Sequence, residues 1–149
     1  MPKEKSSIKI KRLRPDAGLP KRATPGSTGF DLFACIGGDG KIMLVGTQPR
    51  IIPTGIAIEV PGGYDVQIRP RSGLSAKGVG VAFGTIDSDY RGEILITMYL
   101  FSPDMAFEIK HGDRIAQMIV SKIADLPLGE VEELTSTERG SRGHGSTGK

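Results

Sequence analysis

Glycine and proline interrupt this chain every few residues, and that spacing leaves little room for long helices. The chain has 21 glycines and 10 prolines, scattered along its length. Between them lie short apolar runs, a pattern typical of many short strands joined by tight turns. We therefore predict an all-β fold, a sandwich, barrel or jelly roll, rather than a sheet alternating with long helices. The ranges expected as strands are 8–11, 30–36, 41–45, 50–52, 55–60, 64–69, 79–83, 93–99, 107–109 and 116–122.

One short segment, residues 72–77, is expected to be helical. Ser72 is the predicted N-cap, and Gly78 is the predicted stop. A helix start with Arg71 and the Gly73 amide beside it can cradle an anion, because its free N–H groups and its dipole point at whatever lies there. The alternative interpretation is an ordinary capped turn next to a surface arginine.

The length of 149 residues suits a single core. We expect one domain over residues 1–137, followed by a flexible arm over residues 138–149. No apolar run is long enough to cross a membrane, and the N-terminus lacks the apolar core of a signal peptide, so we expect a cytoplasmic protein without membrane contact. Cys35 is the single cysteine and lies in an apolar run, which predicts a buried core residue. With only His111 and His144 as histidines, a zinc site of usual ligand spacing is not expected.

The positive charge of the chain is concentrated at its N-terminus. Residues 1–22 hold eight Lys or Arg and two Asp or Glu, although the whole chain carries a net charge of only +3. Residues 8–11 alternate isoleucine with lysine, which predicts a solvated edge strand whose lysines discourage sheet-to-sheet pairing. Proteins that bind nucleic acids commonly carry a basic stripe with aromatic residues on the folded body. Aromatic residues make up only 5% of this chain. Stable DNA or RNA binding is therefore not expected and is kept as the minority interpretation.

The richest chemistry lies in residues 84–92, between two apolar runs. This stretch holds two carboxylates, a phenol and an arginine. Interpreted as strand, hairpin tip and strand, it places Asp87 and Tyr90 at the rim of a sheet, where loops on a rigid scaffold commonly carry function. Asp87 is the candidate for activating a water and Tyr90 for holding a sugar, while Asp89 is assigned a structural role. The alternative is an acidic, solvated turn.

The last twelve residues are rich in glycine, serine, threonine and arginine, with one ring at His144. Residues 143–149 match the glycine and lysine spacing of a P-loop. We reject that match, because no buried strand precedes it and the chain ends where the helix should follow. What remains is a cationic, amide-rich arm that can close over phosphates, with His144 able to stack on a base. Its alternative is a disordered tail.

Five ordered segments together resemble the trimeric dUTP pyrophosphatases, the dUTPases, over most of the chain. The similar stretches are Pro-Gly-Ser-Thr-Gly-Phe-Asp-Leu at 25–32, Pro-Arg-Ser-Gly-Leu at 70–74, Gly-Thr-Ile-Asp-Ser-Asp-Tyr-Arg-Gly-Glu at 84–93, Gly-Asp-Arg-Ile-Ala-Gln at 112–117, and the glycine-rich run at 139–148.

This resemblance implies a homotrimer of jelly-roll subunits with active sites shared between chains. The implied reaction is hydrolysis of dUTP to dUMP and pyrophosphate with Mg²⁺, which limits uracil incorporation into DNA and supplies dUMP for thymidylate synthesis. By the family pattern, Asp87 positions and activates the attacking water, and Arg71 and Gln117 join it in the catalytic set. Asp31 is implied to support the metal indirectly, through water.

The same resemblance implies the groups that hold the substrate. Tyr90 would face the deoxyribose, and the uracil edge would be read by the main chain of the 84–92 hairpin. The complete set of implied substrate contacts is Ser72, Gly73, Gly84, Ile86, Tyr90, Arg139, His144, Gly145 and Ser146.

Two positions depart from the family pattern. Many bacterial members carry an asparagine that bonds uracil six residues before the catalytic aspartate, where this chain has Val81, and the commonest ring in the fifth motif is phenylalanine, where it has His144. A dCTP deaminase shares the fold class, but we find no additional carboxylate or zinc set for deamination. A non-catalytic nucleotide-binding module is the second alternative, and a water-activating carboxylate argues against it.

Overall fold

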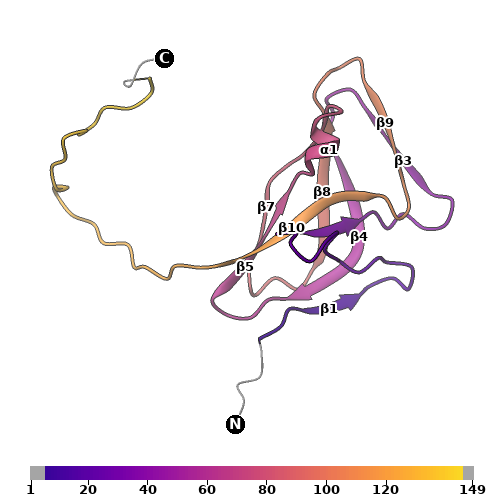
Figure 1. The fold of residues 1–149 in the computed structure, drawn as a ribbon, viewed down its shortest axis with the longest axis horizontal. Helices are drawn as coiled ribbons and strands as arrows, with labels where there is room; N and C mark the ends of the chain where they lie inside the picture. The colour runs from indigo at the N-terminus through magenta and orange to yellow at the C-terminus, as the bar shows by residue number, and fades with distance from the viewer. Residues whose placement is uncertain (1–5, 146–149) are drawn as a thin grey trace, which may run out of the picture.

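The computed structural model describes residues 6–145 and shows an almost entirely β body from which one long segment departs (Figure 1). The elements are β1 (Lys9–Arg12), β2 (Phe30–Phe33), β3 (Lys41–Val45), β4 (Arg50–Glu59), β5 (Tyr64–Arg69), α1 (Ser72–Ser75), β6 (Val79–Val81), β7 (Gly84–Ile86), β8 (Glu93–Leu100), β9 (Ala106–Lys110) and β10 (Arg114–Lys122). The predicted all-β class with one short helix is confirmed.

Two four-stranded sheets and one two-stranded ribbon form this body. The first sheet has the order β1-β4-β8-β6, the second β2-β10-β5-β7, and β3 pairs with β9. The strand pairings are antiparallel. The arrangement is jelly-roll-like, as the family resemblance implied, and the sheets of the described residues do not close into a barrel.

The core lies between the two sheets because their strands alternate in burial. In β8, Ile94, Ile96, Met98 and Leu100 are buried, while the residues between them are more exposed. This period of two is the geometry of a strand with one face on the core. Cys35 is fully buried in the same cluster, as predicted.

The two strands expected at 50–52 and 55–60 are a single strand, β4, with an irregularity inside it. The pairing of β4 with β8 shifts register between Pro53 and Ala57. Gly55 lies in this bulge with φ +69°, a backbone conformation that residues other than glycine adopt at a cost. A Cβ at this position would lie 2.7 Å from Cys35 Sγ and 3.0 Å from Ala17 Cβ, so the bulge also allows a close approach of three segments.

Gly55→Ala is expected to destabilise the protein by about 2–4 kcal/mol, because left-handed strain and overpacking add together. The matched control is Gly63→Ala, where φ is +84° but no heavy atom lies within 4 Å of the added Cβ. The control should cost only about 1 kcal/mol, from the backbone conformation alone. Denaturant unfolding of both variants at one fixed protein concentration measures the difference. Equal losses would show that crowding at Gly55 contributes nothing.

The short helix differs from its prediction at the first turn. Arg71, with extended φ and ψ, occupies the N-cap position and makes no side-chain capping bond, so Ser72 is the first helical residue and not the cap. The helix also ends earlier than expected, at Ser75, and the chain turns back at Gly78, whose φ is +81°. The extended backbone of Arg71 therefore places the first helical residue at Ser72.

Strand β1 is the solvated edge strand expected from its lysines. All four of its residues are exposed, and Lys9 Nζ contacts Glu59 Oε1 at 2.9 Å across the pair with β4. The hydrogen bond from Lys9 lowers the pKa of Glu59 below its ordinary value. Part of the basic N-terminal charge is therefore already paired within the body.

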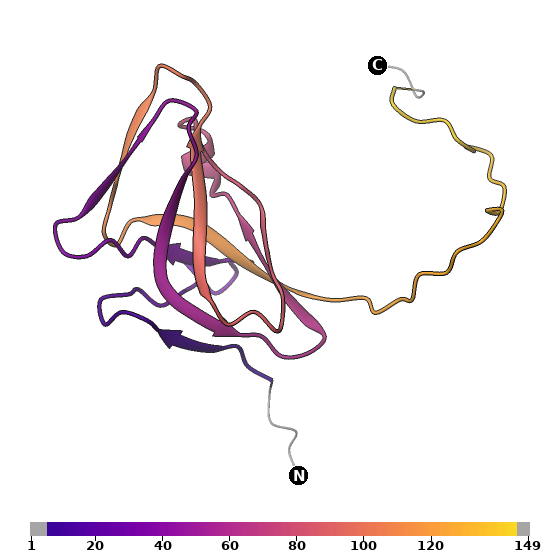
Figure 2. The ribbon, with the colours of Figure 1, turned by 180° about the vertical axis from the view of Figure 1, so that it is seen from behind.

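After β10 the chain leaves the body. Residues 124–145 are exposed and contain no helix or strand, and Figures 1 and 2 show this segment as an extended strap. The chain thus leaves the body well before residue 138, where the arm was expected to begin. The boundary between residues 137 and 138 stays a prediction for the start of the functional arm. Among the helices that the structure describes, none has the length and apolarity to cross a membrane.

Candidate functional site

The loop between β7 and β8 carries Asp87 and Tyr90, and it differs from a simple hairpin tip. Strand β7 pairs with β5 in the second sheet, whereas β8 pairs with β4 and β6 in the first. The loop therefore bridges the two sheets. The Tyr90 N–H donates to the Asp87 carbonyl at 3.1 Å, which closes a tight turn with both side chains exposed.

A small cavity lies against this turn. Its volume is about 160 Å³, and its lining residues are Thr85, Ile86, Asp87, Tyr90, Glu93 and Leu95. Strand β7 is the edge of its sheet, so the main-chain groups on its outer side have no strand partner among the described residues. The cavity thus offers a carboxylate, a phenol ring and free main-chain donors and acceptors within a few residues. Of the predicted substrate contacts, the cavity brings together Ile86 and Tyr90 with the candidate base Asp87, whereas Gly84 lies outside it, at the start of β7.

Tyr90 is held by a hydrogen bond and by a glycine. Its hydroxyl donates to the Glu93 carbonyl at 2.9 Å. A Cβ on Gly92 would collide with the Tyr90 hydroxyl and ring, so glycine is needed at position 92 for the ring to lie where it does. The ring remains partly exposed, with 42% of the residue accessible, and is available to pack on a ligand.

A second group of predicted residues gathers at the end of β5 and the start of β10. Asp31 is buried and lies between two arginines, 3.4 Å from Arg71 Nε and 3.6 Å from Arg114 Nη1. The Arg71 guanidinium also donates to the Arg114 carbonyl at 3.1 Å. Ser72 is exposed beside this cluster. Two guanidinium groups around one carboxylate leave net positive charge for an anion.

Gln117 and Gly73 belong to the same corner. The Gln117 amide donates to the Pro70 carbonyl at 2.9 Å, which ties β10 to the turn before α1. Its carboxamide oxygen fills the space where a Cβ on Gly29 would lie. Gly73 is exposed, with no heavy atom within 4 Å of the position a Cβ would take. A ligand at this corner would therefore meet an open main chain at Gly73 and a Gln117 amide that makes one hydrogen bond among the described residues.

Arg114 is a functional candidate that sequence reasoning missed. It stands inside the fourth family-like segment, but its partner Asp31 is far away in the chain. The pairing of β10 with β2 could have indicated it, because this pairing places Arg114 opposite Phe33, two residues from Asp31 in the same strand.

The structure does not bring these two groups together within one chain. Asp87 precedes Glu93 at one end of β8, whereas α1 leads into Gly78, whose carbonyl accepts from the Phe101 N–H just beyond the other end. A strand of this length places its ends roughly 23 Å apart. Asp87 with Tyr90 and Arg71 with Ser72 are thus two half-sites on opposite ends of the body.

The arm residues lie apart from both half-sites. Arg139 Nε donates to the Arg142 carbonyl at 2.9 Å and Arg142 Nε donates to the Arg139 carbonyl at 3.1 Å, so this stretch folds on itself. His144 and Gly145 follow with positive φ. Figure 2 shows the strap leading away from the body. Ser146 lies outside the described residues.

Val81 has no access to a ligand in this chain. It is 4% exposed and pairs with Met98 in the first sheet. The side chain at position 81 therefore packs in the core and does not hydrogen-bond a base.

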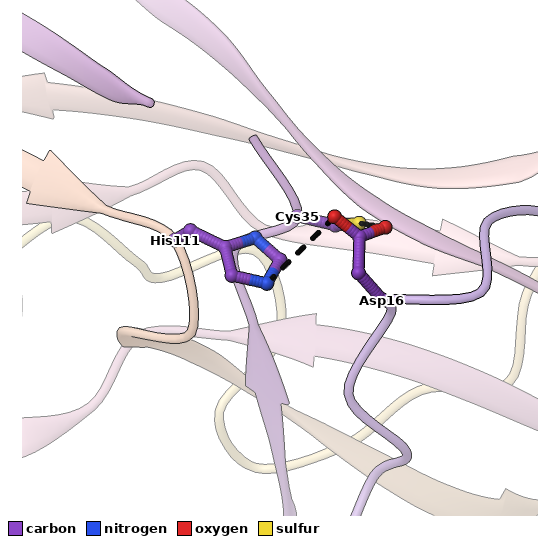
Figure 3. A group of neighbouring side chains, drawn as sticks. All are labelled: Asp16, Cys35 and His111. Atoms are coloured by element: carbon purple, nitrogen blue, oxygen red, sulfur yellow. Dashed lines mark hydrogen bonds and ion pairs between the residues drawn. The ribbon is translucent and has the colours of Figure 1, made fainter. Parts of the chain in front are cut away.

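A further cluster of titratable groups lies outside both half-sites (Figure 3). Asp16, Cys35 and His111 come from three separate segments, and their possible metal-binding atoms lie within 4.8 Å of one another. The Cys35 thiol donates to Asp16 Oδ1 at 3.5 Å, and His111 Nε2 lies 3.9 Å from Asp16 Oδ2. The fold thus brings together three side chains of metal-binding type that their spacing in the sequence did not suggest.

The hydrogen bonds of His111 show that this cluster is a closed network. Its Nδ1 accepts from the N–H groups of Ile36 and Gly37, both at 3.2 Å. A neutral imidazole then carries its proton on Nε2, facing Asp16, so neither nitrogen has a lone pair free for a cation. Burial and the bond to Asp16 raise the pKa of the Cys35 thiol, which keeps it protonated. Partial desolvation alone would raise the pKa of Asp16, but the Cys35 bond and the Arg14 charge bring it below its ordinary value.

Comparison with known proteins places this geometry in a family. Residues 16–148 match the dUTPase family. The chain is 45% identical over 147 residues to the deoxyuridine 5'-triphosphate nucleotidohydrolase of Caulobacter vibrioides, covering 95% of this chain and 94% of that protein. It is 46% identical over 145 residues to the protein of that name from Nautilia profundicola, covering 95% of this chain and 99% of the other. The structure of Staphylococcus bacteriophage 80alpha dUTPase with dUPNHPP superposes with a TM-score of 0.86 at 26% identity, over 96% of this chain and 99% of that one. The chain belongs to the dUTPase family.

Proposed function

We propose that this dUTPase hydrolyses dUTP to dUMP and pyrophosphate with Asp87 as the general base. The observation that carries the assignment is the cavity in which Asp87 and Tyr90 lie beside the free edge of β7. Asp87 takes a proton from a water whose oxygen bonds to the α-phosphorus. The bond from that phosphorus to the α,β-bridging oxygen breaks, and pyrophosphate leaves with the electron pair. Positioned proton transfer of this kind contributes about 10²- to 10⁴-fold in rate.

The triphosphate is gripped by the other half-site. Arg71 and Arg114 supply two guanidinium groups that suit phosphate oxygens in number and geometry. Ser72 and the Gly73 amide lie exposed at the start of α1, and the Gln117 amide faces the same corner. Arg139 from the arm would neutralise the terminal phosphates as charge develops on the leaving group.

The donor set fits a Mg²⁺ ion that the substrate brings with it. Asp31 already faces two guanidinium groups, so it suits a role through water rather than as one member of a carboxylate cage. Mg²⁺ takes oxygen ligands, retains several waters and is commonly held through phosphates. When bound, it would neutralise charge on the triphosphate.

A second copy of the chain must complete the site, and we assign a homotrimer with shared active sites. The two half-sites lie at opposite ends of β8, so one nucleotide cannot reach both within a single chain. The strap offers an independent argument, because it carries large apolar side chains that are exposed within the described part of the chain. These residues are Leu126, Leu128, Val131 and Leu134. Docked on a neighbour, the strap would bury them and deliver Arg139, His144 and Gly145 to a site, with Ser146 following in sequence.

Selectivity rests on the half-site that contains β7. The outer main-chain edge at Gly84 and Ile86 can read the uracil edge and exclude a 5-methyl group by contact. Because Val81 is buried, this main-chain recognition carries more of the discrimination here. The ring of Tyr90 would occupy the space of a 2′-hydroxyl, and His144 would cover the base. The single buried thiol, Cys35, suits the reducing cytoplasm that we assign to the enzyme.

The activity is tested by product analysis with purified protein and Mg²⁺. Pyrophosphate and dUMP are expected from dUTP, with kcat/KM at least about 10³-fold lower for dTTP, dCTP and UTP, since steric exclusion discriminates better than loss of one contact. Heat-inactivated protein is the control for contaminating phosphatases. Release of ammonia from dCTP would instead identify a deaminase and refute the proposal.

A further inference from the structure

We propose that Glu93 is a positioning residue that fixes Tyr90 and thereby sets the preference for 2′-deoxyribose over ribose. This inference rests on the proposed function of the Asp87 and Tyr90 half-site. Glu93 is the first residue of β8, directly after the loop. Its carbonyl accepts from the Tyr90 hydroxyl at 2.9 Å, and its carboxylate Oε1 accepts from the Gly55 N–H at 2.8 Å. One residue thus joins the sugar-facing ring to the bulge of β4.

The β4 end of this connection is rigid. Gly55 is buried, with a left-handed backbone that crowds against Cys35 and Ala17. The preceding residue, Thr54, is 1% exposed and donates its hydroxyl to the Ile94 carbonyl at 2.6 Å. The first two residues of β8 are therefore each bonded to the bulge, and a charged acceptor makes the Glu93 bond one of the stronger kind.

At the loop end, Glu93 holds the hydroxyl of Tyr90, while the Arg91 guanidinium bonds to the main chain of the same loop. Tyr90 is partly exposed, and its hydroxyl bond to Glu93 is its one side-chain hydrogen bond within the described chain. Gly92, between the two residues, has no side chain to restrict the backbone and leaves room for the ring. Movement of the Glu93 main chain would therefore shift the phenol. The main-chain bond from Tyr90 to Asp87 would pass part of this shift to the candidate base.

The geometry makes the acceptor oxygen of Glu93 the essential group. Removing it leaves the Gly55 N–H, in the interior of a bulge, without a partner, which is costly. Glutamine at position 93 would keep an acceptor oxygen at the same place. Aspartate is one methylene shorter and would hold its oxygen farther from the Gly55 N–H. Glu93 also lines the 160 Å³ cavity, so its effect would act on the volume that admits the sugar.

The test compares kcat and KM for dUTP and UTP in Glu93→Ala, Glu93→Asp, Glu93→Gln and Tyr90→Phe, with Glu108→Ala as the control for loss of a surface carboxylate. Glu108 pairs with Lys41 and Lys110 on the β3–β9 ribbon, away from the loop. We expect Glu93→Ala to lower the ratio of kcat/KM for dUTP over UTP about tenfold or more, because small misplacements of positioning groups carry large penalties. Glu93→Asp should act in the same direction, and Glu93→Gln should stay within about twofold of wild type.

A double variant shows whether Glu93 acts through Tyr90. If it does, Glu93→Ala combined with Tyr90→Phe should lower the ratio no further than the larger single effect, since coupled residues are not additive. Unfolding midpoints are measured in parallel, and Glu93→Asp takes the place of Glu93→Ala if the alanine variant does not fold. A lowered midpoint with an unchanged dUTP-to-UTP ratio would overturn the inference and leave Glu93 a structural residue. If wild-type protein hydrolyses dUTP and UTP equally, the proposed sugar selection itself is wrong, and this outcome is separate from a failure confined to the Glu93 variants.

Discussion

Replacing Asp87 by asparagine is expected to lower kcat for dUTP by about 10²- to 10⁴-fold, the range that a positioned general base contributes. Asparagine keeps the size and polarity of the side chain but cannot take a proton from water. Because Asp87 is exposed on a turn closed by main-chain atoms, the substitution should leave the fold and nucleotide affinity nearly unchanged. Single-turnover kinetics and calorimetric titration with a non-hydrolysable analogue separate the two quantities.

Asp89→Asn is the matched control, because it removes a carboxylate from the same loop two residues away. Asp89 is exposed and is absent from the residues that line the cavity, so kcat should change by no more than about threefold, as for a screened surface charge. If Asp87→Asn retains wild-type kcat, or if Asp89→Asn loses as much, the assigned base is wrong.

Mixing two inactive variants is expected to restore activity if the half-sites come from different copies. Asp87→Asn damages the half-site on the loop, and Arg71→Ala damages the phosphate half-site at the other end of β8. When the two proteins are unfolded together and refolded in equal amounts, about a quarter of the shared sites combine one intact half from each variant. Each variant refolded alone should stay near background. The assay is initial rate per protomer, with subunit exchange confirmed by mass spectrometry.

The control for this mixture is a chain carrying both substitutions, refolded with wild type. Shared sites again predict about a quarter of full activity, whereas complete sites within single chains predict about half for this control and none for the mixture of single variants. An inactive mixture of single variants beside a half-active control would therefore contradict the shared site. Both mixtures contain the same total number of substitutions, so differences in folding yield affect them alike.

The strands were predictable where one face is buried and the pattern has a period of two. The range 93–99 was nearly that of β8, whose apolar residues alternate toward the core. Strand β7 was missed because three residues, one of them glycine, carry too little pattern to be separated from the preceding run. The join of 50–52 with 55–60 into β4 was missed for a related reason, since Pro53 and Gly55 indicate a break when the neighbouring strands are unknown.

The site residues divide in the same way. Asp87, Tyr90, Arg71 and Ser72 stand in short local motifs that are visible in the sequence. Glu93 ends one of these motifs, but the positioning role proposed for it could not be inferred there, because that role depends on the N–H of Gly55 in a different strand. The grouping of Asp16 with His111 was also invisible, since the two are brought together only when the β9–β10 turn packs beside the N-terminal segment.

The sequence by itself determined the fold class and the family and named candidates for the reacting groups, because turn residues, burial periodicity and short motifs are local properties of the chain. Tertiary structure alone decided that the 87–92 loop bridges two sheets, that Asp31 lies between two arginines, and that the candidate base Asp87 and the candidate phosphate ligand Arg71 lie at opposite ends of β8. Those facts depend on strand pairing between distant residues, which is settled by the packing of the whole core. The same packing separates the two candidate groups within one chain, and this separation is the basis for the proposed shared site.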